Sequence, residues 1–521
     1  MRRKQRQRPG RDKRNAPRKV NKAGAAPSRR AESFGGRACA LLNQGIEHLR
    51  AGRFAEAERV FQYVLASEPE NDEAFGVLGL LAHQTGNDEA AVELIGRAVA
   101  IDGSKADYHA NLGSALGALG RLDEAVASCR RGVAIDPDYA DARYNLALFL
   151  QRQEKTEEAV EQYRKLLAIE PGNDDALDNL GVALSRLGRL DEAIKQYRRA
   201  LAIAPDNPST HQNLAHALLM RGDYAEGWAE YEWRWSNPDF PSARRDFAEP
   251  QWDGAPLDGR VILLHAEQGM GDTIQFVRFA PLVAARGGRV VLECQEPLAP
   301  LLAGCDGVEH VVAKGEPLPR LDVHAPLLSL PHLLGVTLDT LPAEIPYLAV
   351  PAGRMVPLTV PPTTAIKAGL LWAGCATDGD DHSRSCPPDA LAPLLDVAGV
   401  SLFSLQKGPQ AAELERLDGP GRIADLGYRL ADFADTAAAI AQLDVVIGVD
   451  SAAAHLAGAL GRRVWLLLHT PSDWRWMSGR DDSPWYPSAR LFRQPRDGDW
   501  AGAVVALRAE LERLAGNAPK T

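Results

Sequence analysis

The hydrophobic pattern divides the 521-residue chain into two halves of different character. From Ala38 onward, small residues recur in a gapless 34-residue frame, with frames opening at 38, 72, 106, 140, 174 and 208. Gly or Ala stands at positions 8 and 20 of the frames, and four frames carry Pro at position 32. Small residues let paired helices approach closely, and Pro ends the second helix because it lacks the N–H that a continuing helix needs. The frame predicts six helix pairs.

This frame resembles the tetratricopeptide repeat over residues 38–241, which implies a stacked superhelix with a concave groove. Position 6 is Asn in five of the six frames: Asn43, Asn111, Asn145, Asn179 and Asn213. Each amide offers a donor and an acceptor, so a row of them could hold an extended polypeptide. The row from Asn111 to Asn213 resembles the inner ladder of O-GlcNAc transferases, which implies an acceptor groove. The alternative is that these amides bond within and between repeats.

After Arg260 the pattern changes to short apolar runs that alternate with helical segments. The runs are VILLHA, RVVLEC, VEHVVA and LDVHAPL and, after a proline-rich stretch, KAGLLWAG, SLFSLQ, IADLG, DVVIGV and RVWLLL. Such alternation predicts two parallel sheets, in residues 260–350 and 365–515, that bind ligand between facing strand ends. Residues 242–259, rich in Pro, Asp and Gly, are predicted to form a linker. The aromatic residues just before them are expected to dock the superhelix onto the second half of the chain.

Two motifs of the second half resemble glycosyltransferase family 9, the bacterial heptosyltransferases. They are HAEQGMGDTIQFVRF and DVVIGVDSAAAHLAGALGRRVWLLL, while SLQKG and DSPWYPSARLFRQ resemble its tetratricopeptide-bearing relatives. The resemblance covers about residues 250–515. It implies an α-solenoid followed by an α/β GT-B fold of two Rossmann-like lobes.

The same resemblance implies a chemistry. The expected reaction moves a sugar from a nucleotide diphosphate to a hydroxyl, with inversion and without metal. The layout is similar to that of O-GlcNAc transferases, so a protein Ser or Thr held by the repeats is the leading acceptor. The alternatives are a heptosyltransferase-like enzyme of glycan or lipopolysaccharide assembly and a non-catalytic interaction scaffold. No cofactor is expected beyond the nucleotide sugar as co-substrate.

The first motif supplies candidates for the proton acceptor. Gly269 and Gly271 let the backbone turn sharply and approach a ligand. Asp272 matches the family's catalytic aspartate, which would take the proton of the attacking hydroxyl, and Glu267 is the second candidate base. As an alternative, Asp272 caps the helix that begins after it.

The second motif supplies candidates for donor binding. Asp450 and Ser451 end a strand and open a helix, whose first N–H groups favour a diphosphate, and His455 lies one turn later on the same face. The alternatives are an ordinary helix cap and a packed core histidine. Arg384 and Lys407 follow strands of this lobe and would stabilise the leaving group, unless they are solvated loop charges. The family often has Lys near the place of Arg384.

Composition adds limits. Residues 1–37 carry a net charge of +12 against −22 for the remainder, which predicts a disordered basic tail able to contact anionic surfaces. No apolar run reaches the roughly 18 residues of a membrane helix, and the six cysteines are scattered, which favours reduced thiols and a cytoplasmic location. The acids at 378–381 and the trio Cys375, His382 and Cys386 lack the context of a metal site, so no metal is expected.

Overall fold

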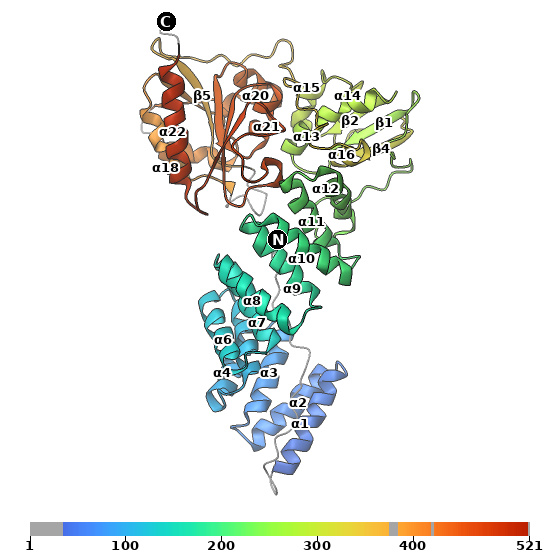
Figure 1. Ribbon diagram of the computed structural model, residues 1–521, viewed down its shortest axis with the longest axis vertical. Helices are drawn as coiled ribbons and strands as arrows, with labels where there is room; N and C mark the ends of the chain where they lie inside the picture. Colours follow the sequence, from blue (N-terminus) through green and yellow to red (C-terminus); the bar gives the residue numbers. More distant parts are fainter. Residues whose placement is uncertain (1–34, 375–383, 418–420, 519–521) are drawn as a thin grey trace, which may run out of the picture. The chain divides into compact units, whose positions relative to one another are not determined.

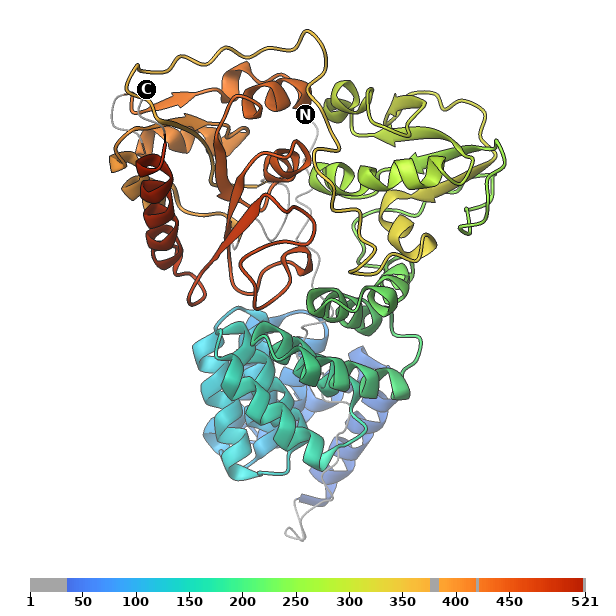
Figure 2. The same cartoon turned by 45° about the horizontal axis from the view of Figure 1, so that its top comes forward.

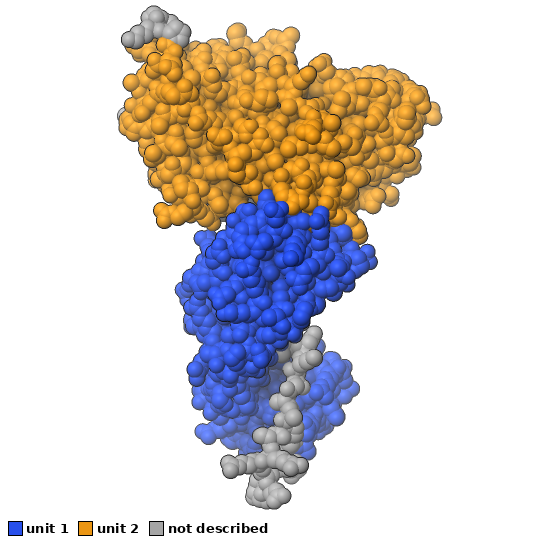
Figure 3. All heavy atoms as spheres, viewed as in Figure 1, with its two compact units in different colours: residues 1–213 blue, residues 214–521 orange. Residues whose placement is uncertain are grey.

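The computed structural model describes residues 35–374, 384–417 and 421–518, with side chains from residue 40. The chain divides into two compact units, residues 1–213 and 214–521, shown in Figure 3. The described residues of the first unit, from residue 35 on, form helices without strands, and both parallel sheets lie in the second unit.

The six predicted helix pairs are present, and Figure 2 shows those of the first unit stacked in chain order. Each pair joins an odd-numbered helix to the even-numbered helix after it, and the sixth pair begins at the border of the units. The pairs are α1(Gly35–Arg50) with α2(Phe54–Ser67), α3(Asp72–Gln84) with α4(Asp88–Ile101), α5(Ala106–Ala118) with α6(Leu122–Ile135), α7(Ala140–Arg152) with α8(Thr156–Ile169), α9(Asp174–Arg186) with α10(Leu190–Ile203), and α11(Pro208–Arg221) with α12(Tyr224–Tyr231).

The small residues act as the frame predicts. A Cβ placed on Gly113 would lie 2.3 Å from Cys129 Sγ, and one on Gly181 would lie 2.4 Å from a ring carbon of Tyr197. In both cases the glycine belongs to the first helix of a pair and its neighbour to the second. A larger side chain would push the paired helices apart.

The first sheet of the second unit has the order β3-β2-β1-β4, with every pairing parallel. Its strands are β1(Val261–His265), β2(Arg289–Cys294), β3(His310–Ala313) and β4(Val323–Pro326), which match the four predicted runs (Figure 1). Short helices connect them: α13(Met270–Phe276), η3(Val277–Phe279), α14(Ala280–Ala284), η4(Glu296–Leu298), α15(Ala299–Leu302), η5(Leu327–Ser329) and α16(Leu330–Leu333).

The second sheet has the order β10-β9-β8-β5-β6-β7 and is also parallel throughout. Its strands are β5(Ile366–Leu371), β6(Val400–Ser404), β7(Ile423–Asp425), β8(Val445–Val449), β9(Val464–Leu468) and β10(Ala489–Arg493). Counted within the lobe, this is the Rossmann order 3-2-1-4-5-6, whose ligands bind where the strand order reverses. Here the reversal falls between β5 and β8, and in the first sheet it falls between β1 and β4.

Helices flank the strands of this second sheet. They are α18(Pro388–Leu391), η6(Ala392–Asp396), η7(Pro409–Glu413), α19(Leu414–Leu417), η8(Gly427–Arg429), α20(Phe433–Ile440), α21(Ala452–Ala459), η9(Trp474–Trp476) and α22(Trp500–Gly516). The hydrophobic pattern did not predict β10 or α22. Residues 489–493 (ARLFR), at the edge of the sheet, contain two arginines, which is a weaker signal than the continuous apolar runs of the central strands.

Residues 242–259, predicted as a linker, lack helices and named strands but belong to the first lobe. The main-chain N–H of Trp252 donates to the His324 carbonyl (2.8 Å), and Gln251 forms a parallel β-bridge with His324. Trp228 of α12, which lies in the second unit, packs edge-on against Trp474 and Phe276, with ring centroids 5.3 and 5.9 Å away. The segment after the repeats is therefore built into the second unit.

Two broader expectations can be compared with the described part of the chain. Cys129, Cys294, Cys305 and Cys386 are buried free thiols. Within residues 35–374, 384–417 and 421–518, no helix combines the length and apolar character needed to cross a bilayer.

Candidate functional site

The two sequence motifs meet where α13 and α21 begin. Gly269 is the N-cap of α13, after β1, and Ser451 is the N-cap of α21, after β8, where its Oγ accepts the Ala454 N–H at 3.4 Å. A Cβ on Gly271 would lie 3.0 Å from His455 Cδ2 and 3.5 Å from Ala452 Cα. The glycine turn of the first lobe therefore lies directly against the first turns of α21 in the second.

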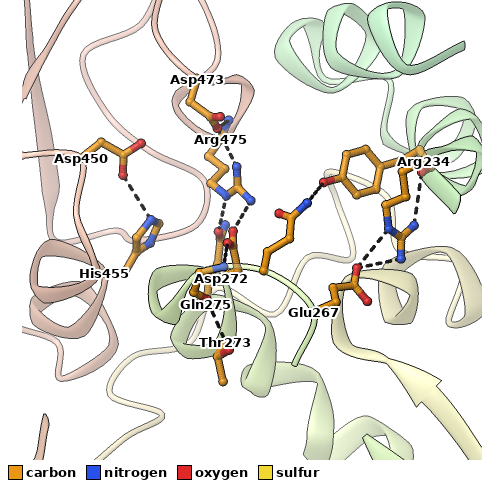
Figure 4. A network of polar contacts seen from close by, with 12 residues as sticks. Arg234, Glu267, Asp272, Thr273, Gln275, Asp450, His455, Asp473 and Arg475 are labelled. Carbon is orange, nitrogen blue, oxygen red and sulfur yellow. Dashed lines mark hydrogen bonds and ion pairs between the residues drawn. The ribbon is translucent and has the colours of Figure 1, made fainter. Parts of the chain in front are cut away.

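Both carboxylate oxygens of Asp272 are engaged. Oδ2 accepts the Gly269 N–H at 2.8 Å, which caps α13, and Oδ1 accepts a short hydrogen bond from Arg475 Nη2. Arg475 belongs to the second lobe, so this ion pair links the two lobes (Figure 4). The structure thus gives Asp272 the helix-capping contact as well as a cationic partner.

Arg475 is a buried cation that sequence reasoning missed. Its Nη1 also binds Asp473 at 2.9 Å, its Nε donates to Gln275 Oε1 at 2.9 Å, and its guanidinium lies 4.2 Å from the ring centre of Trp474. Burial opposes its charge, but Asp473 and Asp272 outweigh burial and raise the pKa of Arg475. A permanent positive charge therefore stands at the junction of the lobes.

Asp450 and His455 form a buried pair beside this junction. His455 Nε2 lies 3.3 Å from Asp450 Oδ1, its Nδ1 lies 2.8 Å from Tyr486 Oη, and its ring stacks on Trp476. Burial alone would raise the pKa of Asp450, but the hydrogen bond and charge of His455 hold that pKa well below its ordinary value. Asp450 is therefore an ionised carboxylate that fixes the orientation of the imidazole.

Glu267 lies on the turn between β1 and α13, at the reversal of strand order in the first lobe. Its side chain is 2% exposed, and its Oε1 binds Arg234 Nε at 3.0 Å and Nη2 at 2.8 Å. Across the described residues, no hydrogen-bonding atom reaches the other carboxylate oxygen, Oε2. Burial raises the pKa of Glu267 to about 7, although Arg234 opposes this shift.

Arg234 is the second buried cation that the sequence did not reveal. Its side chain is 0% exposed, and besides Glu267 it binds Glu232 at 2.7 Å, Ser329 Oγ at 2.7 Å and the Tyr231 carbonyl at 3.2 Å. Ser329 follows β4, the strand beside β1 at the reversal point. Every guanidinium N–H that can donate is thereby used.

The two missed arginines share a local sequence. Arg234 stands in EWRWS, the helix η2(Glu232–Ser236), and Arg475 stands in DWRWM, at helix η9. Each arginine binds the acid two residues before it and one acid of the segment that follows β1, which is Glu267 in the turn for Arg234 and Asp272 in the first turn of α13 for Arg475. The sequence feature that could have predicted both buried arginines is a Trp-Arg-Trp triplet after an acid. Aromatic neighbours remove water from a guanidinium, so that a buried arginine needs a carboxylate partner.

The two predicted phosphate cations lie in different surroundings. Arg384 and Asp450 both influence the pKa of His469, which burial lowers, so these groups share one electrostatic neighbourhood at the reversal between β5 and β8. Lys407 follows β6, is exposed, and donates a short hydrogen bond to the Leu430 carbonyl.

The asparagine row is packed into the repeats. Asn111, Asn145 and Asn179 are buried, and Asn179 Nδ2 donates to Tyr144 Oη and to the Asp175 carbonyl, each at 3.0 Å. Asn213 Nδ2 donates to both carboxylate oxygens of Asp178 at 3.1 Å. The bonds of Asn179 and Asn213 thus join one repeat to its neighbour, which is the alternative use of these amides.

Several sequence predictions concern residues outside the described part. The basic tail up to residue 34, the acids at 378–381, Cys375 and His382 lie there. Among the residues the structure does describe, no three His, Cys, Asp or Glu side chains gather in a metal-binding arrangement.

Comparison with known families identifies the repeats. Models of the tetratricopeptide repeat match residues 42–106, 113–154, 138–206 and 196–229. The N-terminal part of the chain therefore consists of tetratricopeptide repeats, a class with the capacity to bind proteins.

Among curated proteins, the chain is similar to Protein FlbA of Caulobacter vibrioides, at 26% identity over 339 residues. The match spans 57% of this chain and 54% of FlbA, so it covers about half of that relative. Solved structures that resemble the repeats include MamA, at 30% identity, with 31% of this chain and 94% of MamA covered and a TM-score of 0.29. Another is a thermophilic tetratricopeptide-repeat protein of Thermus thermophilus, at 25% identity, with 35% of this chain and 99% of that protein covered and a TM-score of 0.30.

Proposed function

We propose that this chain is a glycosyltransferase of GT-B architecture. It would move a sugar from a nucleotide diphosphate to an acceptor hydroxyl, with inversion and without metal. The observation that carries the proposal is the meeting of the Gly269–Asp272 turn with the first turn of α21, each at the carboxyl end of a parallel sheet. Ligands of open parallel sheets bind at such ends.

The parts of this junction suit a nucleotide-sugar donor. The first N–H groups of α21 carry partial positive charge for the diphosphate, and Arg384 supplies a cation in the same neighbourhood. His455 is oriented by Asp450 at the point where α13 and α21 touch. The turn after β1 and the first turn of α13 carry one carboxylate each, Glu267 and Asp272, that could take the proton of the attacking hydroxyl.

For the acceptor, a polypeptide is the leading candidate because the repeats precede the catalytic half. The buried amides of Asn145 and Asn179 would contribute by fixing the packing of the repeats, since Asn179 binds its neighbour. Glycan or lipopolysaccharide assembly is the competing use of the same reaction. The second alternative is a non-catalytic scaffold, in which the repeats bind proteins and the second half of the chain has no activity; the matches to the tetratricopeptide repeat favour this alternative.

Calorimetry of the full chain with a panel of nucleotide-diphosphate sugars tests the proposal. We expect one donor to bind with one site per chain, and Ser451→Ala to weaken it. A panel in which no nucleotide sugar binds would favour the scaffold.

A further inference from the structure

The second helix of the sixth repeat differs from the second helices of the repeats before it. Helices α2, α4, α6, α8 and α10 have 14 residues each, whereas α12 has 8 and passes directly into the 3₁₀ helix η2. Trp228, Tyr231 and Arg234 follow one another at intervals of three residues, so they share one face of this segment, and all three are buried. This face packs against both lobes of the second unit.

In the first lobe, the face holds the turn after β1. Arg234 forms the buried ion pair with Glu267 at 2.8 Å, and the Tyr231 hydroxyl accepts a hydrogen bond of 3.1 Å from the side-chain amide of Gln268. Shortly after the segment, Ser242 donates a short hydrogen bond to the Glu267 carbonyl. Two successive residues of the turn are thus fixed by the end of the repeats.

Gly269, the next residue of the turn, connects these contacts to Asp272. Its N–H donates to Asp272 Oδ2 at 2.8 Å, and its carbonyl accepts the Thr273 N–H at 3.2 Å. The position of the Asp272 carboxylate therefore depends on the backbone of residues 267–269. A displacement of about 1 Å in a reacting group can lower a rate about 100-fold.

In the second lobe, the same face lies beside the partner of Asp272. Trp228 packs edge-on against Trp474 and Trp485, with ring centroids 5.3 and 6.4 Å away. The guanidinium of Arg475, which binds Asp272, lies 4.2 Å from the ring centre of Trp474. One short segment therefore supports the ion pair between the lobes from both sides.

Resting on the proposed function, we propose that residues 224–236, at the end of the sixth repeat, form a positioning element for the transfer reaction. They act through Asp272 and Arg475, whose separation and orientation they fix. The donor contacts expected at the start of α21 lie elsewhere in the second lobe. Loss of one contact in this segment therefore slows turnover and leaves the affinity for the donor unchanged.

Tyr231→Phe is the sharpest test, because it removes one hydroxyl and keeps the ring. That ring packs against Trp228 and lies 4.9 Å from the Arg234 guanidinium. Release of nucleoside diphosphate by the full chain is measured with the donor found by calorimetry and with water as acceptor. We expect kcat to fall about tenfold, while KM for the donor changes by less than about twofold.

Tyr163→Phe is the matched control. Tyr163 is buried in the fourth repeat, and its hydroxyl also bonds to a glutamine side chain, that of Gln151, at 3.4 Å. Its loss weakens the repeats without touching the turn after β1, so kcat should stay at the wild-type value. Equal falls in kcat for Tyr163→Phe and Tyr231→Phe would mean that the effect comes from repeat stability, which would overturn the positioning role.

Gln268→Met removes the other side of the same hydrogen bond. If Tyr231 acts through Gln268, the variant that combines Tyr231→Phe with Gln268→Met should lose no more kcat than the more affected single variant. Losses that multiply would show that the two side chains act separately, which would contradict the proposal.

Hydrogen exchange of the full chain needs no donor and separates this inference from the proposed function. We expect Tyr231→Phe to speed exchange in residues 266–273 several-fold and to leave α21 at its wild-type rate. If wild type cleaves a donor and Tyr231→Phe does so with unchanged kcat, the positioning role is refuted and the glycosyltransferase stands. If wild type binds no donor, the proposed function fails, and unchanged exchange at 266–273 would then refute the positioning of the turn as well.

Discussion

The main chain at Gly271 lies against the imidazole of His455, so that a Cβ on this glycine would be 3.0 Å from His455 Cδ2. The glycine belongs to α13 of the first lobe and the histidine to α21 of the second. A Cβ at this position would make a contact tighter than an ordinary van der Waals contact, so His455 would have to give by a few tenths of an ångström. The contact fixes how closely the glycine turn and the start of α21 can come together.

Replacing Gly271 by Val should therefore destabilise the second unit by about 1–3 kcal/mol, since the new methyl groups would overlap His455 and Ala452. Thermal unfolding measures the effect as a melting temperature lowered by several degrees. Gly304→Val is the control, because a Cβ at Gly304 meets nothing within 4 Å. Equal melting temperatures for the two variants would refute the close contact.

The ion pair between Asp272 and Arg475 should couple the two lobes. Removing either partner leaves a buried charge without its counterion, which costs about 3–5 kcal/mol. In a cycle of Asp272→Ala and Arg475→Ala, the double variant should lose clearly less stability than the two single losses added together. The exposed pair Arg289 and Glu309 serves as the control and should show no such coupling. Additive losses at Asp272 and Arg475 would mean that the pair does not join the lobes.

Ser451→Ala separates helix capping from donor binding. The loss of the cap should cost about 1 kcal/mol of stability, and the loss of a phosphate contact should weaken donor binding by about 1–3 kcal/mol. Asp499 caps α22 by accepting the Gly502 N–H at 2.9 Å, so Asp499→Ala repeats the loss of a cap elsewhere in the lobe. Equal donor affinity in both variants, measured by calorimetry, would leave Ser451 as a cap alone.

Glu267 should make the folded state less stable as pH rises. Its pKa is about 7 in the folded chain against an ordinary 4.5, so between these values the folded state binds more protons than the unfolded state. The stabilisation from this proton is full below about pH 4.5 and is lost by about pH 7, roughly 3 kcal/mol in all. Melting temperatures of wild type and Glu267→Gln should therefore diverge in favour of the variant between pH 5 and pH 8. Parallel curves would contradict the raised pKa.

His265 should act in the opposite direction. It is buried between Phe247 and His324, neither ring nitrogen has a hydrogen-bond partner among the described residues, and burial lowers its pKa to about 3. Below about pH 6.5 the unfolded state then binds more protons than the folded state. The free energy of unfolding therefore decreases as the pH is lowered, by about 2 kcal/mol between pH 6.5 and pH 5. His265→Phe removes the titrating group and should lose less stability at pH 5, measured by urea unfolding. An unchanged acid sensitivity would exclude His265 as its source.

Much of the fold could be predicted because it depends on periodic patterns. Gly113 and Gly181 mark the close approach of paired helices, and their partners in the structure are residues of the second helix of each pair. Continuous apolar runs predicted β1 and β8, because strands that are buried on both faces of a sheet are apolar throughout. The edge strand β10 was not predicted, because its arginines interrupt the apolar run.

The site was less predictable because its partners are far apart in sequence. The motifs around Asp272 and Ser451 were visible, but nothing local shows that Arg475 binds Asp272 or that Arg234 binds Glu267. The asparagine row illustrates the same limit, since the consensus gives the position of Asn179 and only tertiary packing gives its partner Tyr144. Burial and charge pairing are properties of the folded chain.

The most direct test of the central claim is a structure of the full chain with its nucleotide-diphosphate sugar bound. We predict the diphosphate within hydrogen-bonding distance of Ser451 and the first N–H groups of α21, with the sugar facing the turn that carries Glu267 and Asp272. A donor bound away from both turns, or at α21 with its sugar directed away from that turn, would contradict it.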